Sequence, residues 1–359
     1  MTLLVTGAKG FLGRHLQLYL RAHDISHVVA DRDEWPDLAN YTRDCTQVIH
    51  LAGVNRGTDT EVENGNSQLA RDLINAFGDQ TPECLVFANT IHADRDDPYG
   101  RGKSNSATIL KHWLESQGKK FVDVRLPNLF GEGGRPFYNS FVASFIELVV
   151  TGGTPQINEA TVPLLHAQDA AKTLFDSLTS SDSLIAPAGT PRTVQQVWDM
   201  LVRMHADYEQ GTIPVLESKF EVNLFNSLRA RMFTDRPFIT LVPHADNRGH
   251  FVETARVRSG GGQTSFSTTV PGITRGQHYH LRKIERFVVM AGEGTMRLRH
   301  VLDDKIVEIV GTGDNPIAVD MPTGWAHSIT NTGSETLLTQ FWINELYNPS
   351  DPDTFAQEV

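Results

Sequence analysis

The chain has 359 residues, of which 40% are hydrophobic and 21% are charged, enough for two domains that each bury a core. Its formal net charge of -11 at pH 7 argues against a nucleic-acid partner, because nucleic-acid binding depends mainly on Lys and Arg. The sequence contains no run of eighteen apolar residues, so we expect no membrane insertion.

The first half of the chain alternates short apolar runs with amphipathic segments. Helical periodicity is clearest over 13–22 and 107–117. Strands that alternate with helices indicate a parallel sheet covered by helices, a Rossmann-type doubly wound α/β fold. The strands that we expect cover 3–7, 27–31, 47–53, 84–90 and 121–127.

A glycine-rich turn, TGAKGFLG, follows the first expected strand. Gly7 allows a tight turn, Gly10 lets the backbone approach a pyrophosphate, and Gly13 lets helix and sheet pack closely. The phosphates of a dinucleotide then lie at the helix N-terminus, where unpaired N–H groups favour anions. Because the pattern stands between a strand and an amphipathic helix, we interpret it as a cofactor loop that also includes Lys9 and Phe11.

The residues after the second expected strand bear on the ribose of the cofactor. Asp31 suits a free 2′-hydroxyl, whereas Arg32 suits a 2′-phosphate. Both are also ordinary charges for a solvated loop. The residues alone leave the choice between NADH and NADPH open.

A tyrosine and a lysine stand one helical turn apart in YGRGK, at Tyr99 and Lys103. An ammonium near a phenol lowers the pKa of the phenol, so Tyr99 is a candidate general acid or base. Thr90 ends the preceding apolar run, where its hydroxyl can hold a substrate carbonyl. We predict that these three residues form a catalytic site.

This trio and the glycine loop resemble the extended short-chain dehydrogenase/reductase family over residues 1 to about 230. Thr90 replaces the commoner Ser of the family and Gly102 replaces a frequent Ser, but the required functional groups remain. The segment between the second strand and residue 47 is short, so we expect the third strand of the family to be missing. The resemblance implies further cofactor contacts at Leu51, Ala52, Gly53, Asn66 and Asn128.

The sequence pattern changes between residues 190 and 240. Two helical stretches, 193–204 and 217–232, close the first half, and short alternating runs follow. Gly, Asn, Asp or Pro separates nearly all these runs, which is typical of an antiparallel barrel or sandwich. We expect two domains, 1–232 and 233–359. The strands expected in the second cover 238–243, 250–257, 263–270, 285–292, 295–300, 306–311, 316–322, 327–333 and 336–343.

The second half carries residue types that bind metals. In GQHYHLRKIER, His278 and His280 alternate with Tyr279, so both imidazoles face one side of a strand. Glu285 follows a turn and can point at the same centre, and His327 follows the P-x-G turn of PTGWAHSITN. Three imidazoles and one carboxylate suit zinc, with iron, manganese and nickel as alternatives.

These four residues, with Gly292 and the pattern P-x-G-x-x-H-x-x-x-N, resemble the cupin family over about 234–359. The resemblance implies an all-β jelly-roll barrel. The second motif of the family usually begins with a Gly six residues before the Pro. Here Pro316 takes that place, with Gly313 nearby.

Both domains, in this order, resemble bifunctional reductase/epimerases of capsule and O-antigen assembly in the UDP-N-acetyl-L-fucosamine pathway. Matching stretches include HLAGVNR, DDPYGRGK, RLPNLFG and PGITRGQHYH. The resemblance implies that the cupin domain inverts C3 of UDP-2-acetamido-2,6-dideoxy-4-hexulose. The reductase domain then reduces C4 with NADPH to the N-acetylated UDP-6-deoxy-L-talosamine, and we expect a homodimer.

Two rival hypotheses remain. In one, the cupin domain is a dimerising or ligand-sensing module on a single-function reductase. In the other, the first domain is an NADP-binding regulator without turnover. The catalytic trio speaks against the second hypothesis, because a sensor needs the glycine loop but no acid.

Cysteine usage bears on the compartment. The chain has two cysteines, Cys45 and Cys84, and both lie at apolar runs, so we expect buried free thiols. Free thiols fit a reducing compartment, and an apolar run from Thr2 leaves no room for a signal peptide. We therefore expect a cytoplasmic protein.

Overall fold

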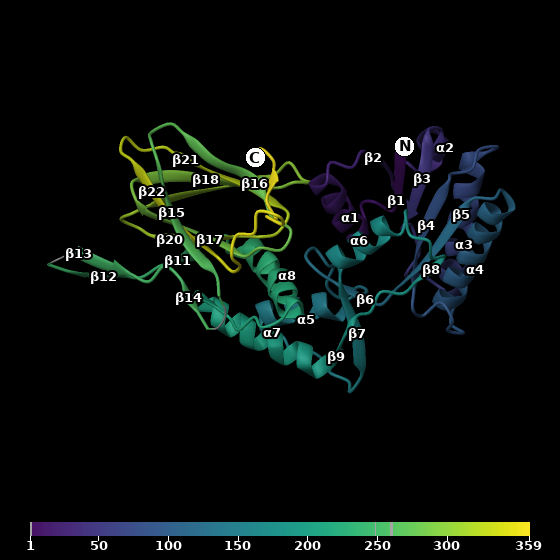
Figure 1. Ribbon diagram of the computed structural model, residues 1–359. Coiled ribbons are helices and arrows are strands. Elements are labelled where there is room, and N and C mark those ends of the chain that lie inside the picture. The colour runs from purple at the N-terminus through teal and green to yellow at the C-terminus, as the bar shows by residue number, and fades with distance from the viewer. Residues whose placement is uncertain (1, 248, 259–260) are drawn as a thin grey trace. The chain divides into compact units, whose positions relative to one another are not determined.

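The structure is a computed structural model that describes residues 2–247, 249–258 and 261–359 (Figure 1). The chain divides into two compact units. The first comprises Met1–Phe130, Tyr138–Ser140 and Ala160–Arg192. The second comprises Gly131–Phe137, Phe141–Glu159 and Thr193–Val359.

A six-stranded sheet forms the centre of the first unit. Its members are β1 (Thr2–Thr6), β2 (His27–Ala30), β3 (Cys45–His50), β4 (Cys84–Thr90), β5 (Lys120–Leu126) and β8 (Leu184–Ile185). The order is β2-β1-β3-β4-β5-β8, and every neighbouring pair is parallel. The predicted parallel sheet is therefore confirmed.

Helices cover both faces of this sheet (Figure 1). They are α1 (Phe11–Ala22) and α6 (Ala167–Asp176) on one face, and α3 (Asp59–Phe77) and α4 (Pro98–Ser116) on the other. Leu3 and Val5 of β1 pack in the core with α1 and α6, whereas Leu4 packs with α3 and α4. Since successive side chains point to opposite faces, a strand covered on both sides must be apolar throughout.

The sheet ends at β2, beside β1. Residues 31–44, all of which the structure describes, form the short 3-10 helix η1 (Trp35–Asp37) and α2 (Leu38–Thr42) but no strand. This confirms that the third strand of the reductase family is missing. A separate three-stranded sheet, which the sequence did not predict, holds β6 (Asn128–Phe130), β7 (Thr161–His166) and β9 (Thr190–Thr193).

Three helices belong to the second unit: α5 (Phe141–Thr151), α7 (Val194–Glu209) and α8 (Lys219–Asp235). Capping boxes begin α7 and α8, at Thr193 and Ser218, so both predicted helical stretches are confirmed. The predicted boundary between residues 232 and 233 falls inside α8. Every residue from 223 to 229 is buried, so α8 packs on all sides and groups with the barrel.

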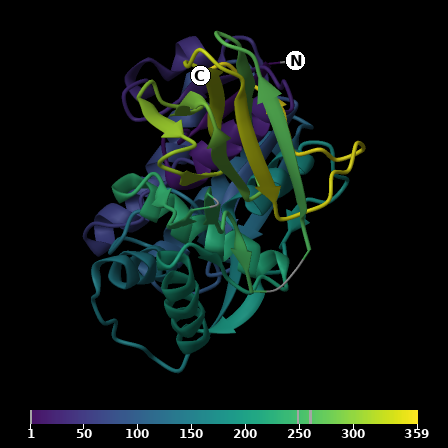
Figure 2. The ribbon, with the colours of Figure 1, turned by 90° about the vertical axis from the view of Figure 1, so that its left-hand side faces the viewer.

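Two five-stranded antiparallel sheets make up the barrel. One consists, in order, of β11 (Ile239–Thr240), β20 (Ile317–Met321), β17 (Glu285–Ala291), β22 (Leu337–Ile343) and β15 (Gln263–Thr269). The other consists, in order, of β19 (Ile306–Thr312), β18 (Glu293–His300), β21 (Trp325–Asn331), β16 (Thr274–Tyr279) and β23 (Phe355–Ala356). Figure 2 shows the green β15 beside the yellow β22. The predicted antiparallel barrel is confirmed.

The core of the barrel lies between the two sheets. Phe287 and Val319 of the first sheet pack with Leu298 and Ile329 of the second, and Phe233 of α8 joins them. A hairpin of β12 (Pro243–Asp246) and β13 (Gly249–Val252) and a short pair of β10 (Thr212–Ile213) and β14 (Arg256–Val257) also belong to this unit.

The two cysteines bear on a further prediction. Cys45 and Cys84 are buried free thiols, as predicted, and each begins a strand of the parallel sheet. Burial raises the pKa of the Cys45 thiol to about 11.

Across the described ranges, no helix combines the length and the apolar character that a membrane span requires.

Candidate active site and candidate metal centre

The glycine-rich turn lies between β1 and α1. Gly7 has a φ of 70°, and a Cβ there would lie 2.7 Å from the backbone nitrogen of Ala52. A Cβ at Gly13 would lie 2.3 Å from the carbonyl oxygen of Gly7. Backbone contacts therefore explain both glycines, the first in the tight turn and the second in the close packing of α1.

The N-terminus of α1 is open to an anion. The helix begins at Phe11 after Gly10, with no acidic residue in its first turn and no hydrogen bond from a described side chain at its N-cap. A Cβ at Gly10 would meet only the carbonyl oxygen of Gly7, at 3.1 Å. These features fit the pyrophosphate of a dinucleotide, which such a helix end binds through backbone N–H groups.

Asp31, which directly follows β2, is hydrogen-bonded to the glycine loop. The Asp31 carboxylate accepts hydrogen bonds from the backbone N–H groups of Lys9 at 2.6 Å and Arg32 at 2.7 Å. The Lys9 ammonium lies 3.0 Å from Asp33 and 3.1 Å from Glu34. The Lys9 ammonium and three carboxylates thus lie beside Arg32 where the ribose of a dinucleotide would bind, and the charge pattern alone selects neither cofactor.

Asn66 on α3 holds the loop that follows β3. Its side-chain oxygen accepts from the backbone N–H of Val54 at 3.1 Å, and its amide donates to the carbonyl oxygen of Val54 at 2.7 Å. A Cβ at Gly53 would lie 3.2 Å from this side-chain oxygen and 3.8 Å from the Lys103 ammonium. Asn66 therefore fixes the loop that contains the predicted cofactor residues Leu51, Ala52 and Gly53.

Lys103 is 5% exposed and points toward the end of β4. Its ammonium donates to the carbonyl oxygen of Ala88 at 2.6 Å and lies 4.2 Å from the centre of the Phe87 ring. Burial lowers the pKa of Lys103 to about 8, against the attraction of Asp123. A buried ammonium with so low a pKa is a frequent feature of functional sites.

Tyr99 lies one turn before Lys103 on α4, and the Asp97 carboxylate caps the start of that helix. Burial raises the pKa of the Tyr99 phenol, and Asp97 raises it further. The predicted lowering of this pKa by Lys103 is therefore not observed, because burial dominates and the ammonium is bonded to Ala88. A raised pKa keeps the phenol protonated, which is the state that a proton donor needs.

The carboxyl ends of parallel strands gather the predicted residues at one edge of the sheet. Thr6 of β1 pairs with His50 of β3, and Thr90 of β4 pairs with Leu126 of β5. Thr90 ends β4, and the glycine loop, the 51–53 segment and Asn128 follow the ends of β1, β3 and β5, where ligands of such sheets bind. The Thr90 hydroxyl accepts a hydrogen bond from the backbone of His92 at 3.2 Å.

Close packing explains the glycine that precedes Lys103. A Cβ at Gly102 would lie 3.1 Å from the Cα of Glu63 and 3.1 Å from the carbonyl oxygen of Val62. Gly102 therefore lets α4 approach α3, and a serine side chain would have to push the two helices apart.

The four predicted metal ligands converge inside the barrel. His278, His280, Glu285 and His327 each offer one ligand atom, and these atoms lie within 4.8 Å of one another. A Glu285 oxygen lies 2.7 Å from Nε2 of His280 and 3.6 Å from Nε2 of His327. Three of the four are buried, and His278 is half-buried.

A bulge in β16 directs the histidines. Its pairing with β21 shifts between Gly276 and His278, and Gln277 has a φ of 62°. A Cβ at Gly276 would lie 2.7 Å from the carbonyl oxygen of His327. The sequence predicted a regular strand here. The bulge instead places His278 directly opposite His327.

The pKa values of three cluster residues are shifted in directions that favour metal binding. Burial lowers the pKa of His327 to about 3 and also lowers the pKa of His278. Hydrogen bonding and attraction from the histidines hold the pKa of Glu285 below its usual value, against the opposing effect of burial. Nε2 of His327 is buried without a hydrogen-bond partner in the described part of the chain. A metal binds an ionised carboxylate and imidazole nitrogens without a proton, and the lowered pKa values of Glu285, His278 and His327 suit that requirement.

Asp353 is a neighbour of this cluster that no sequence pattern predicted. The main-chain oxygen of Asp353 lies 2.5 Å from Nδ1 of His280, which leaves Nε2 facing the cluster. No local spacing signals this contact, because the two residues are 73 positions apart.

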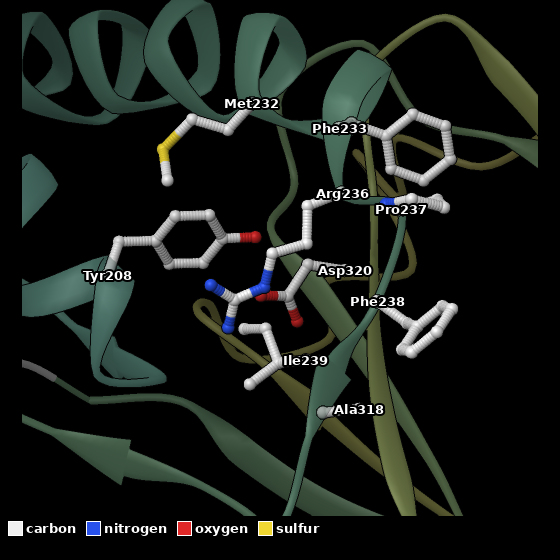
Figure 3. Close-up of a pocket in the computed structure, with 9 residues that line it drawn as sticks. All are labelled: Tyr208, Met232, Phe233, Arg236, Pro237, Phe238, Ile239, Ala318 and Asp320. Carbon is white, nitrogen blue, oxygen red and sulfur yellow. The ribbon is translucent and has the colours of Figure 1, made fainter. Parts of the chain in front are cut away.

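The second unit contains a pocket, and Figure 3 shows the residues that line it. The Asp320 carboxylate in its wall accepts two hydrogen bonds from Arg286, at 2.7 and 2.8 Å. Because Arg286 follows Glu285 on the strand, its side chain points to the opposite face. The residues that line the pocket are Tyr208, Met232, Phe233, Arg236, Pro237, Phe238, Ile239, Ala318 and Asp320.

Family models match both halves of the chain. The NAD dependent epimerase/dehydratase family matches residues 3–188, and the polysaccharide biosynthesis C-terminal domain matches residues 244–355. The UDP-2-acetamido-2,6-beta-L-arabino-hexul-4-ose reductase of Pseudomonas aeruginosa is 32% identical over 371 aligned positions, covering 100% of this chain and 99% of the relative. The spore coat polysaccharide biosynthesis protein SpsL of Bacillus subtilis is 29% identical over 122 residues, 32% of this chain and 81% of the relative.

A solved structure matches the whole chain as well. The capsular polysaccharide assembling protein CapF from Staphylococcus aureus is 30% identical, with a TM-score of 0.63, and the match covers 100% of both chains. The similarity to CapF and to the Pseudomonas reductase therefore extends over both units of the chain.

Proposed function

The chain belongs to the NAD dependent epimerase/dehydratase family and ends in a polysaccharide biosynthesis C-terminal domain, and we propose that it is a bifunctional nucleotide-sugar enzyme of capsule or O-antigen assembly. The cupin domain inverts C3 of UDP-2-acetamido-2,6-dideoxy-4-hexulose. The reductase domain then reduces the C4 ketone with NADPH. The product is the N-acetylated UDP-6-deoxy-L-talosamine, a precursor of UDP-N-acetyl-L-fucosamine.

One observation carries the proposal: a single chain combines a reductase-type site with a separate cluster of four metal-ligand side chains. Both reactions use the same ketone. The C4 carbonyl acidifies the neighbouring C3–H bond, and it is also the group that accepts a hydride. Two sites with different chemistry on one chain fit two successive steps on one functional group.

The reductase step assigns roles to three residues. NADPH, held at the glycine loop, supplies the hydride to C4 when it is bound. Tyr99 donates the proton to O4, and its raised pKa keeps that proton available at neutral pH. Lys103 orients the ribose of the cofactor, and Thr90 holds the substrate carbonyl from the end of β4.

The epimerase step assigns the cluster to the metal. A zinc ion or another divalent metal would polarise the carbonyl and so stabilise the enolate that forms when C3 loses its proton. His278, His280, Glu285 and His327 would hold this metal. The half-buried His278 marks the side from which a substrate would approach. Epimerisation removes one proton and returns one on the opposite face, so it needs no oxidant or reductant.

The two proposed reactions are assigned to the two segments that the family models match. We assign reduction to residues 1–232 and epimerisation to residues 233–359, although α7 and α8 pack with the barrel. We also assign the enzyme to the cytoplasm, where nucleotide sugars and NADPH are available.

A second candidate function is a single-function NADPH-dependent 4-ketoreductase whose cupin domain only dimerises or senses a ligand. One observation favours a role of the cupin domain in dimerisation. β15 ends its sheet, and Phe266 on this strand is 73% exposed. A homodimer formed along β15 is compatible with both candidate functions, so dimerisation by itself does not separate them.

Isotope exchange distinguishes the two candidates. The Tyr99→Phe variant, given the 4-keto sugar in deuterated water without NADPH, should place deuterium at C3, because epimerisation needs no nicotinamide. The His278→Ala variant should lose this exchange but still reduce sugar that already has the inverted configuration. A cupin that only dimerises or senses predicts no exchange in either variant and normal reduction of the uninverted sugar by His278→Ala. Exchange that persists in His278→Ala would place the epimerase in the reductase pocket and overturn the proposal.

A further inference from the structure

The C-terminal segment wraps around the predicted metal site, and we propose that Asp353 is a positioning residue for the metal ligand His280. The inference rests on the proposed metal site and extends it beyond the four ligands. It assigns to residues 351–359 the role of fixing one ligand and the turn that leads to the next. Three sets of contacts support this role.

The first set joins the Asp353 carboxylate to the turn between the ligands His280 and Glu285. One carboxylate oxygen accepts a hydrogen bond from the backbone N–H of Leu281 at 3.1 Å. The other accepts from the N–H groups of Arg282 and Lys283, both at 3.0 Å. Three consecutive N–H groups bound to one buried carboxylate fix the turn more firmly than neutral acceptors would, because hydrogen bonds to ionised groups are the stronger kind.

The second set joins the Asp353 backbone to His280 itself. The main-chain oxygen of Asp353 lies 2.5 Å from Nδ1 of His280, and both residues are buried. Because this carbonyl holds Nδ1, Nε2 is the ring nitrogen that faces the cluster, 2.7 Å from a carboxylate oxygen of Glu285. A carbonyl in this position fixes the ring orientation and the tautomer of a metal-binding histidine.

The third set anchors the chain on both sides of Asp353. After it, β23 pairs with β16, which places Ala356 opposite the ligand His278. Before it, the Lys283 ammonium donates to the carbonyl oxygen of Pro352 at 2.6 Å. Asp353 itself has a φ of 42°, a conformation in which most L residues are strained. The segment thus holds an unfavourable backbone conformation at the point where its carbonyl meets His280.

The test compares four full-length proteins: wild type, Asp353→Gly, Asp353→Asn and the matched control Asp351→Asn. Glycine keeps the positive φ but removes the carboxylate, whereas asparagine tolerates the φ and keeps one acceptor oxygen. Asp351 lies in the same segment, but its carboxylate contacts the Arg282 side chain instead of the turn. Zinc affinity is measured by competition with a chromophoric chelator, and Co²⁺-loaded samples report the ligand geometry through their absorption spectra.

We expect Asp353→Gly to weaken zinc binding about ten- to a hundredfold, the usual effect of removing such a supporting group, and to change the Co²⁺ spectrum. Asp353→Asn should recover much of the affinity, and Asp351→Asn should match wild type. Asp351 and Asp353 lie in the second unit, so an unchanged circular dichroism spectrum of each full-length variant serves as the check that the barrel is folded. Equal zinc affinity in wild type and Asp353→Gly would overturn the inference, as would an equal loss in Asp351→Asn. A wild-type protein that binds no metal would instead refute the proposed metal site.

Discussion

The ammonium of Lys103 lies 2.6 Å from the carbonyl oxygen of Ala88, inside the first unit and at the end of its parallel sheet. The side chain is 5% exposed, so the protein keeps a cation where burial opposes charge. Burying this charge lowers the stability of the folded chain, and the lysine that bears it is the residue that we propose orients the cofactor ribose.

Replacing this lysine should therefore stabilise the first unit at neutral pH. The pKa of Lys103 is about 8 in the folded chain against 10.5 unfolded, so Lys103→Met should raise the free energy of unfolding at pH 7 by up to about 3 kcal/mol. In wild type, the loss of unfolding free energy caused by the buried charge is complete below pH 8. It shrinks as the pH rises toward 10.5, because in that range the folded chain has released the proton and the unfolded chain still holds it. Native-state hydrogen exchange of β4 amides measures the difference. A stability gap that stays constant between pH 7 and pH 10.5 would contradict the buried-charge explanation.

Removal of the Tyr99 hydroxyl should stop reduction without stopping cofactor binding. Tyr99→Phe keeps the ring on α4 but removes the proton donor, so NADPH oxidation by the 4-keto sugar should fall about a hundred- to ten-thousandfold. NADPH fluorescence titration should give an unchanged dissociation constant. Wild-type turnover in this variant would remove Tyr99 from the mechanism.

Arg32 should select NADPH over NADH. Arg32→Ala should weaken NADPH binding about ten- to a hundredfold, the usual contribution of a charged hydrogen bond to phosphate, and leave NADH binding nearly unchanged. Arg43 is an exposed arginine beyond α2, and Arg43→Ala serves as the control. Titration of both cofactors into both variants measures the effect. Equal losses for the two cofactors would make Arg32 a bystander.

Asn66 should affect the cofactor through the loop that it holds. Asn66→Ala breaks both hydrogen bonds to Val54, so the 51–54 segment should loosen and NADPH affinity should fall. Hydrogen exchange of the Val54 amide should rise in the same variant. A loss of affinity with an unchanged Val54 exchange rate would mean that Asn66 contacts the cofactor directly.

One divalent metal per chain should be present in the purified protein. His278→Ala should deplete it, because one of four ligands is lost, and His244→Ala, at an exposed histidine of β12, should not. Elemental analysis of the three proteins gives the stoichiometry. A wild-type protein that is free of metal and exchanges C3 at full rate would reduce the cluster to a structural feature.

Local patterns determined most of the secondary structure and most of the candidate site residues. The glycine loop lies within eight residues between a strand and a helix, so its spacing predicted the turn whose backbone contacts the structure shows at Gly7 and Gly13. His278, His280 and Glu285 also lie close together in the chain. Alternation of apolar and polar residues predicted the strands of the barrel, because a sheet with one buried face imposes that period.

Only the tertiary structure decided the features that depend on burial and on distant segments. The pKa of Tyr99 rises instead of falling, because burial and Asp97 act on it while Lys103 bonds to Ala88. The bulge at Gln277 sets the facing of His278, although the sequence alone reads as a regular strand. Helices α7 and α8 group with the barrel because α8 is buried on all sides. Asp353 reaches His280 from 73 positions away, a contact that no sequence period encodes because the fold brings the two together.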